Sequence, residues 1–79
     1  MPNETQLLER IALDPAIRSG KPTVRGTRLA VRDVLGYLAA GMSRDEVFAE
    51  FPELDAEDVA ACCAYAARLM QGLSVADAA

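Results

Sequence analysis

The chain has no histidine, and its only two cysteines, Cys62 and Cys63, are neighbours in the sequence. Without histidine, the side chain that most often acts as a base at neutral pH is missing. Adjacent cysteines lack the spacing of zinc ligands, and on a helix their side chains diverge and cannot readily form a disulfide. We therefore expect no metal, and we expect both thiols to be small core hydrophobes in a reducing cytosol.

Other polar residues that enzymes use are explained here without chemistry. Lys21 lies in a Gly-Lys-Pro turn and not in a phosphate-binding loop of the Walker type, so no nucleotide site is expected. Five acidic residues occupy the starts of predicted helices, where capping and the helix dipole account for them: Asp45, Glu46, Asp55, Glu57 and Asp58. The sequence therefore predicts a protein that is not an enzyme and needs no cofactor.

Long apolar runs are also absent. No stretch approaches the ~20 residues of a membrane span, and the N-terminus carries acids where a signal peptide carries positive charge. We expect a cytoplasmic protein with no membrane contact. A chain of 79 residues buries only about 60–65% of its unfolded surface, which leaves a thin core. Since disulfides and metals are not expected, self-association is the expected further source of stability.

Negative charge is missing from the segment 18–32, RSGKPTVRGTRLAVR, called the basic segment below. The net charge of −4 divides into +5 for this segment and −9 for the rest of the chain. Such asymmetry indicates a surface for an anionic partner. The alternative is a solvated hairpin whose charges keep an edge strand from aggregating. The predicted contact residues are Arg18, Lys21, Arg25, Arg28 and Arg32.

The spacing of apolar and turn residues predicts a single domain over 1–79, mainly α-helical with a small N-terminal β-element. In residues 9–30, the stretch Leu8–Leu13 favours a short strand, although a helical turn is also compatible. Two short runs of β-forming residues around Gly26 then indicate a hairpin or a tight extended loop. The sequence allows the tail, 73–79, to be flexible.

Residues 31–72 are predicted to form a three-helix, helix-turn-helix-like module. Its first helix runs from Val31 to Gly41. The second begins after Ser43, with Glu46 completing a capping box, and ends before Pro52. The third is capped by Asp55 and extends to about residue 71, with Gly72 as its stop.

The third helix contains no charged residue from Val59 to Ala67. A helix that is apolar on every side should be buried on every side, and two short helices and a hairpin offer too little cover. We therefore expect a homodimer, although alanines that only raise helix propensity are the alternative. The stripe expected to be buried within the chain is Val59, Cys62, Cys63, Ala66, Leu69 and Met70. The residues expected at the dimer interface are Ala60, Ala64, Tyr65 and Ala67.

Several short motifs give the chain a family resemblance over about residues 9 to 68. They are Asp14-Pro15, Gly20-Lys21-Pro22, Gly26-Thr27-Arg28, Gly41-Met42-Ser43 and Phe51-Pro52-Glu53-Leu54. Their combined order and spacing resembles the bacterial family catalogued as domain of unknown function 433, in which tyrosine is more frequent at the position of Phe51. The resemblance implies a helix-turn-helix-like module in a toxin-antitoxin system. In this role the protein would resemble VapB antitoxins, which neutralise PIN-like ribonuclease toxins.

A helix-turn-helix reads DNA with the start of its second helix. Here that helix presents Arg44 among the acids Asp45, Glu46 and Glu50, which phosphates would repel. We therefore interpret the turn as architectural and assign anion binding to the basic segment. Its arginines could pair with the metal-binding carboxylates of a toxin or with operator phosphates. The resemblance thus implies an antitoxin that neutralises a PIN-like ribonuclease, and of the two contacts we favour the toxin, with operator DNA second. A stand-alone DNA-binding regulator and a structural dimerisation module are the alternatives.

Overall fold

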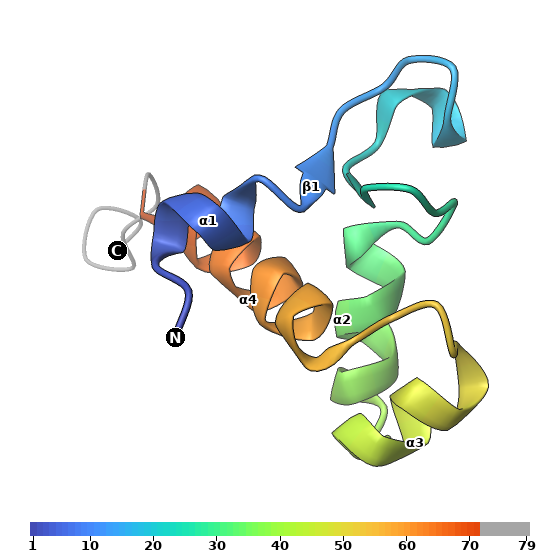
Figure 1. The fold of residues 1–79 in the computed structure, drawn as a ribbon. Coiled ribbons are helices and arrows are strands. Elements are labelled where there is room, and N and C mark those ends of the chain that lie inside the picture. The colour runs from blue at the N-terminus through green and yellow to red at the C-terminus, as the bar shows by residue number, and fades with distance from the viewer. Residues whose placement is uncertain (72–79) are drawn as a thin grey trace, which may run out of the picture.

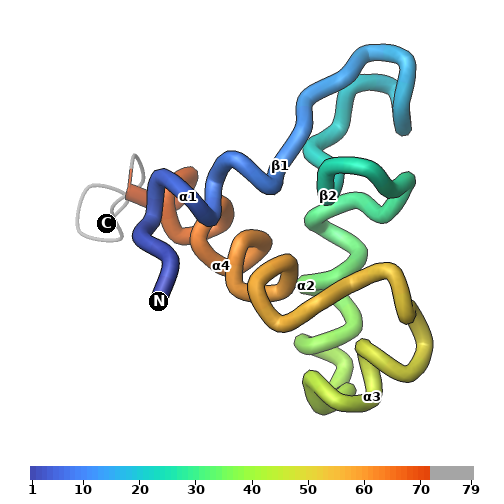
Figure 2. The backbone as a smooth tube through the Cα atoms, viewed as in Figure 1, coloured from blue at the N-terminus to red at the C-terminus, as the bar shows by residue number. Residues whose placement is uncertain are grey.

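The computed structural model describes residues 1–71, and the tail expected at 73–79 lies outside this range. Within it, four α-helices (Figure 1) accompany a two-stranded antiparallel sheet near the N-terminus, whose strands are both labelled in Figure 2. This is the mainly α-helical class with a small β-element that the sequence predicts. The three helices expected after residue 30 are present, and one short helix precedes them.

The additional helix, α1, spans Glu4–Leu8 and was not predicted from the sequence. The Asn3 side chain accepts a hydrogen bond from the Gln6 backbone N–H at 2.8 Å, and Gln6 returns the contact in a capping box. A helix of five residues is not stable alone. It packs along α4 (Ala56–Met70) (Figure 1). An ion pair also joins Glu4 to Arg68.

The sheet pairs β1 (Ile11–Ala12) with β2 (Thr23–Val24), and Ile11 lies opposite Val24. The strand expected within Leu8–Leu13 is therefore confirmed. After β2 the chain turns at Gly26, where φ is +82°, and returns so that Thr23 bridges to Ala30. This is the hairpin expected around Gly26. The first part of the connection between the strands, residues 13–20, projects away from the helices (Figure 2), and the chain returns to α2 at Pro22, whose carbonyl accepts from the Val31 N–H at 2.9 Å.

The C-terminal helices are α2 (Val31–Ala39), α3 (Arg44–Glu50) and α4. Ser43 caps α3 and forms the expected capping box with Glu46, and α3 ends before Pro52 as predicted. Asp55 caps α4. None of the helices within residues 1–71 is long and apolar enough to cross a membrane.

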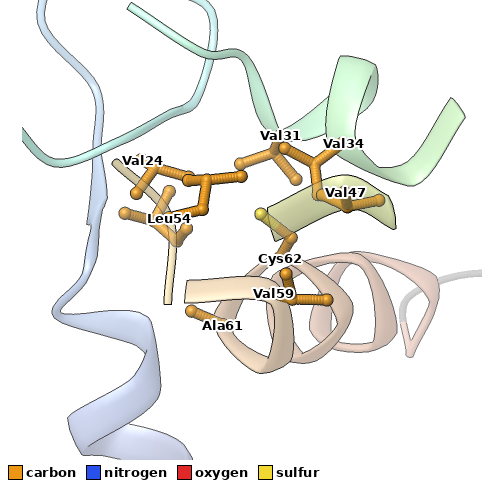
Figure 3. Packing of buried hydrophobic residues seen from close by; sticks show 9 residues of the cluster. Val24, Val31, Val34, Val47, Leu54, Val59, Ala61 and Cys62 are labelled. Atoms are coloured by element: carbon orange, nitrogen blue, oxygen red, sulfur yellow. The ribbon is translucent and has the colours of Figure 1, made fainter. Parts of the chain in front are cut away.

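The core lies where these three helices meet, around Val34, Val47, Val59 and Cys62, each at most 1% exposed (Figure 3). Val24 of the sheet closes the cluster from another side. The sheet is thereby fixed to the helices, and the basic segment, which contains β2, is anchored to the core at Val24.

The apolar stripe expected on α4 is buried only in part. Val59 and Cys62 are buried and Ala66 is half-buried, but Leu69 and Met70 are 59% and 58% exposed. Cys63 is also exposed, so the expectation that both thiols lie in the core is wrong for this one. Side chains one residue apart on a helix differ by about 100° in direction, which turns Cys63 away from the core that holds Cys62.

Candidate interaction surface

The basic segment consists of a tight turn followed by the hairpin. The turn, η1 (Arg18–Gly20), has positive φ at three consecutive residues: 51° at Arg18, 58° at Ser19 and 82° at Gly20. Residues other than glycine adopt this conformation at a cost of about 1–2 kcal/mol each. Backbone strain of this kind collects at binding and catalytic sites, where the surrounding structure maintains it.

Two of the five predicted contact residues are held by partners within the chain. Arg25 donates from Nε to the Glu9 carbonyl at 2.8 Å and from Nη2 to the Ile11 carbonyl at 3.2 Å. Arg18 forms an ion pair with Asp33 at 3.2 Å and donates to the Arg28 carbonyl at 3.2 Å. Both guanidinium groups thus fasten the segment to its surroundings, and neither presents a free fork of donors to a partner.

The other three, Lys21, Arg28 and Arg32, are exposed and form no ion pair within residues 1–71. Arg32 lies in the first turn of α2, where the positive end of the helix dipole disfavours a cation. Its nearest acidic neighbour in that turn, Asp33, is already paired with Arg18. These three charges therefore form no ion pair within the described chain and remain available to an anion.

A cluster around Arg10 was missed by the sequence analysis. The Arg10 guanidinium forms ion pairs with three carboxylates. It lies 2.9 Å from an oxygen of Asp58 and of Glu57, and 3.1 Å from an oxygen of Asp55. The hydrogen bond to Asp58 in particular raises the pKa of Arg10. The pKa of Asp55 is lowered, first because the Asp58 backbone N–H donates to it and then because Arg10 pairs with it. The acids at the start of α4 thus have their cationic partner, Arg10, within the same chain.

This result corrects the view that capping alone accounts for these acids. Three carboxylates at one helix start exceed what one cap requires, and that excess was the available signal for a cationic partner. Among residues 1–71, no group of three or more cysteines and acids is arranged to hold a metal ion.

The connection between α2 and α3 has the form of a helix-turn-helix. Gly41 has a φ of +103°, which favours glycine, and Ser43 then caps α3. The start of α3 exposes Arg44, Asp45 and Glu46. The pKa of Glu46 is lowered because the Ser43 backbone N–H donates to its carboxylate. A DNA-reading helix-turn-helix would direct this tip at bases, and here the tip exposes the acidic side chains of Asp45 and Glu46.

The predicted dimer residues do not share one face. Ala67 is exposed and Ala60 and Ala64 are half-buried, on the side of α4 that points away from the core. Part of this side lies near α1, since Leu7 and Ala60 line the same hollow. Tyr65 instead lies toward α2, in a hollow with Val31. The unpredicted helix thus supplies some of the cover that a second chain was expected to provide.

Comparison of the sequence with known protein families identifies the family of this chain. The sequence pattern of the protein family of unknown function DUF433 matches residues 11–66. The chain belongs to the DUF433 family. The match begins at β1 and ends within α4, so it covers the sheet, the basic segment and the core.

Two relatives of this DUF433 domain support the assignment. The uncharacterized protein y4eO of Sinorhizobium fredii (strain NBRC 101917 / NGR234) is 41% identical over 58 residues, which are 73% of this chain and 26% of that protein. The crystal structure of a DUF433 member from Anabaena variabilis has a TM-score of 0.72 at 28% identity, covering 86% of this chain and 76% of that one. The chain thus spans about a quarter of the length of the first relative.

The motifs that mark the DUF433 resemblance have structural explanations in this chain. The Thr27 hydroxyl donates to the Val24 carbonyl at 2.8 Å and accepts from the Leu29 N–H at 3.0 Å, which fixes the hairpin. The Asp14 carboxylate accepts from the Ala16 N–H at 2.9 Å and forms the turn at Asp14-Pro15. Thr27 and Asp14 therefore fix the conformation of the basic segment and its approach. The side chains that the segment exposes are the candidates for binding a partner.

Proposed function

We propose that this DUF433 domain is an antitoxin-type binding protein that neutralises a PIN-like ribonuclease toxin in the cytoplasm and is not itself an enzyme. One observation carries the proposal. Lys21, Arg28 and Arg32 are exposed and lack ion-pair partners within residues 1–71, whereas Arg18 and Arg25 hold the segment in shape. A rigid segment with unpaired cations suits a surface rich in carboxylates.

The chemistry of such a toxin favours arginine. Its active site holds metal-binding carboxylates, and a guanidinium meets a carboxylate with two parallel hydrogen bonds. A partner that inserts arginine there would compete with the metal ion for its ligands. Of the exposed cations, Arg28 and Arg32 have this geometry, while Lys21 contributes a point charge that steers association.

Co-expression with the product of the neighbouring gene, followed by co-purification and an RNA-cleavage assay, tests the proposal. We expect the wild-type domain to co-purify with a nuclease and to inhibit it, and Arg28→Glu to weaken that inhibition by about tenfold or more. Arg44→Glu is the matched control, since Arg44 is an exposed arginine outside the basic segment. If Arg28→Glu and Arg44→Glu both inhibit the nuclease as strongly as wild type does, the basic segment is not the inhibitory surface.

Binding of operator DNA is a second proposed function. The same exposed cations would contact phosphates, and the acidic start of α3 would not read bases. A homodimer through the outward side of α4, at Ala60, Ala64 and Ala67, would double these contacts. Light scattering at micromolar concentration tests the dimer, and a wild-type monomer would reject it.

A further inference from the structure

The inward stripe of α4 continues beyond the core. Val59 and Cys62 are buried, and the same helical face recurs at Ala66 and Leu69, seven and ten residues after Val59. Leu69 nevertheless remains 59% exposed. The last turns of α4 therefore direct an apolar surface toward α2 with no described element covering it.

This surface forms one wall of an apolar groove. Tyr65, Ala66 and Leu69 line it from α4, and Val31 and Leu35 line it from α2. Its volume of about 290 Å³ is at the lower end of the ~300–1,000 Å³ typical of small-molecule pockets. The groove is therefore suited to a few anchoring side chains of a larger partner. Because helices form both walls, it offers no row of backbone donors to an added strand, and a helix is the fitting occupant.

The rim of the groove is cationic. Lys21 and Arg32 lie on it, both exposed, and none of its lining residues is acidic. An occupant that brings carboxylates beside its apolar anchors would pair with both. A second copy of this chain fits poorly, because a two-fold axis through the groove would bring the two rims of like charge together.

We infer that the groove binds an amphipathic helix of a partner protein, with apolar residues four positions apart and Asp or Glu beside them. The inference rests on the proposed function in one respect, that this partner is the nuclease being neutralised. Leu69 and Tyr65 would pack against the apolar anchors, and Arg32 and Lys21 would pair with the flanking acids. The groove and the exposed Arg28 would then act as two parts of one interface.

Leu69→Glu tests the groove, with Leu13→Glu as its matched control. Leu13 is 63% exposed and lies after β1, away from the groove, so the two variants make the same chemical change at similar exposure. We expect Leu69→Glu to weaken nuclease binding by about tenfold or more and Leu13→Glu by less than about twofold, measured by calorimetry. Circular dichroism verifies that both variants are folded.

A second measurement does not depend on the nuclease. Two synthetic helices of about 18 residues would share leucines four positions apart, flanked by glutamate in one and by lysine in the other. The amide resonances of the domain are followed by NMR while each peptide is added. We expect only the acidic peptide to shift the resonances of Arg32, Leu35 and Ala66, and we expect Leu69→Glu to abolish this shift.

The outcomes separate the two proposals. If the nuclease binds wild type and Leu69→Glu equally well, the groove inference is wrong and the antitoxin proposal stands. If the nuclease does not bind wild type, the antitoxin proposal fails and the peptides decide the groove: a shift with the acidic peptide supports it, and no shift or equal shifts reject it. If Leu69→Glu converts a wild-type dimer into a monomer, the groove holds a second copy and the inference is overturned.

Discussion

Arg25 and Arg28 lie three residues apart in the basic segment, but they should respond differently to removal. The Arg25 guanidinium donates hydrogen bonds to the carbonyls of Glu9 and Ile11. Arg28 is exposed and forms no ion pair within residues 1–71. We expect Arg28→Ala to weaken the salt-dependent binding of DNA, and Arg25→Ala to lower the stability of the domain while leaving that dependence unchanged.

The magnitude follows from counting the available cations. Each phosphate neutralised contributes about −0.9 to the slope of log affinity against log salt concentration. If Lys21, Arg28 and Arg32 bind from each protomer of a dimer, the slope should be near −5, whereas engagement of all five cations of the segment would give about −9. Arg28→Ala removes two contacts per dimer and should leave a slope of about −3.6. Arg25→Ala should cost about 1 kcal/mol of unfolding free energy.

Fluorescence anisotropy with promoter DNA, across salt concentrations from about 50 to 300 mM, measures the slope. Urea unfolding of the same variants measures stability. A slope near −9, with equal flattening by Arg25→Ala and Arg28→Ala, would refute the division into structural and binding arginines. In that case Arg25 would leave its carbonyl partners when DNA binds, and the basic segment would not keep its conformation in the complex.

Three further predictions concern α4. A thiol reagent should label Cys63 rapidly in the native protein and Cys62 only on unfolding, because burial above all raises the pKa of Cys62 to about 12; two fast thiols would contradict the packing. Asp55→Ala should cost about 1 kcal/mol at neutral pH through loss of the cap. Because the pKa of Asp55 is lowered, its stabilisation is complete above its unfolded pKa of about 3.9 and is lost as pH falls through the folded value, so the difference in thermal stability between wild type and variant should shrink as the pH is lowered below about 3.9. Ala67→Glu should convert a dimer into a monomer in light scattering, and a dimer that persists would place its interface elsewhere.

The helix boundaries were predictable because local chemistry sets them. Ser43 with Glu46 and Asp55 with Asp58 form capping boxes whose members are three residues apart, so each helix start depends on a short stretch of sequence. The helix at Glu4–Leu8 was missed although Asn3 and Gln6 form the same kind of box. Its short length makes it dependent on packing against α4, and that contact spans most of the chain.

The candidate site was predictable as a segment but not residue by residue. The absence of acids from 18–32 marks the surface, but the separate roles of Arg25 and Arg28 depend on where β1 lies. The cluster of Arg10 with Asp55 and Asp58 likewise joins residues more than 40 positions apart. The excess of acids at the start of α4 signals a cationic partner, but composition and spacing do not identify it as Arg10, because the pairing arises when the sheet docks on the start of α4.

The exposed end of α4 shows how a wrong expectation of burial can be informative. Helical periodicity gives the direction in which Leu69 points, and that direction is the one in which Val59 and Cys62 find the core. Periodicity contains no information on how far along the helix the covering elements reach. The dimer expected from the sequence would instead cover the opposite side of α4, at the alanines. The surface at Leu69 that no element within residues 1–71 covers lies beside Lys21 and Arg32, and the charge of that rim favours an acidic partner over a second copy.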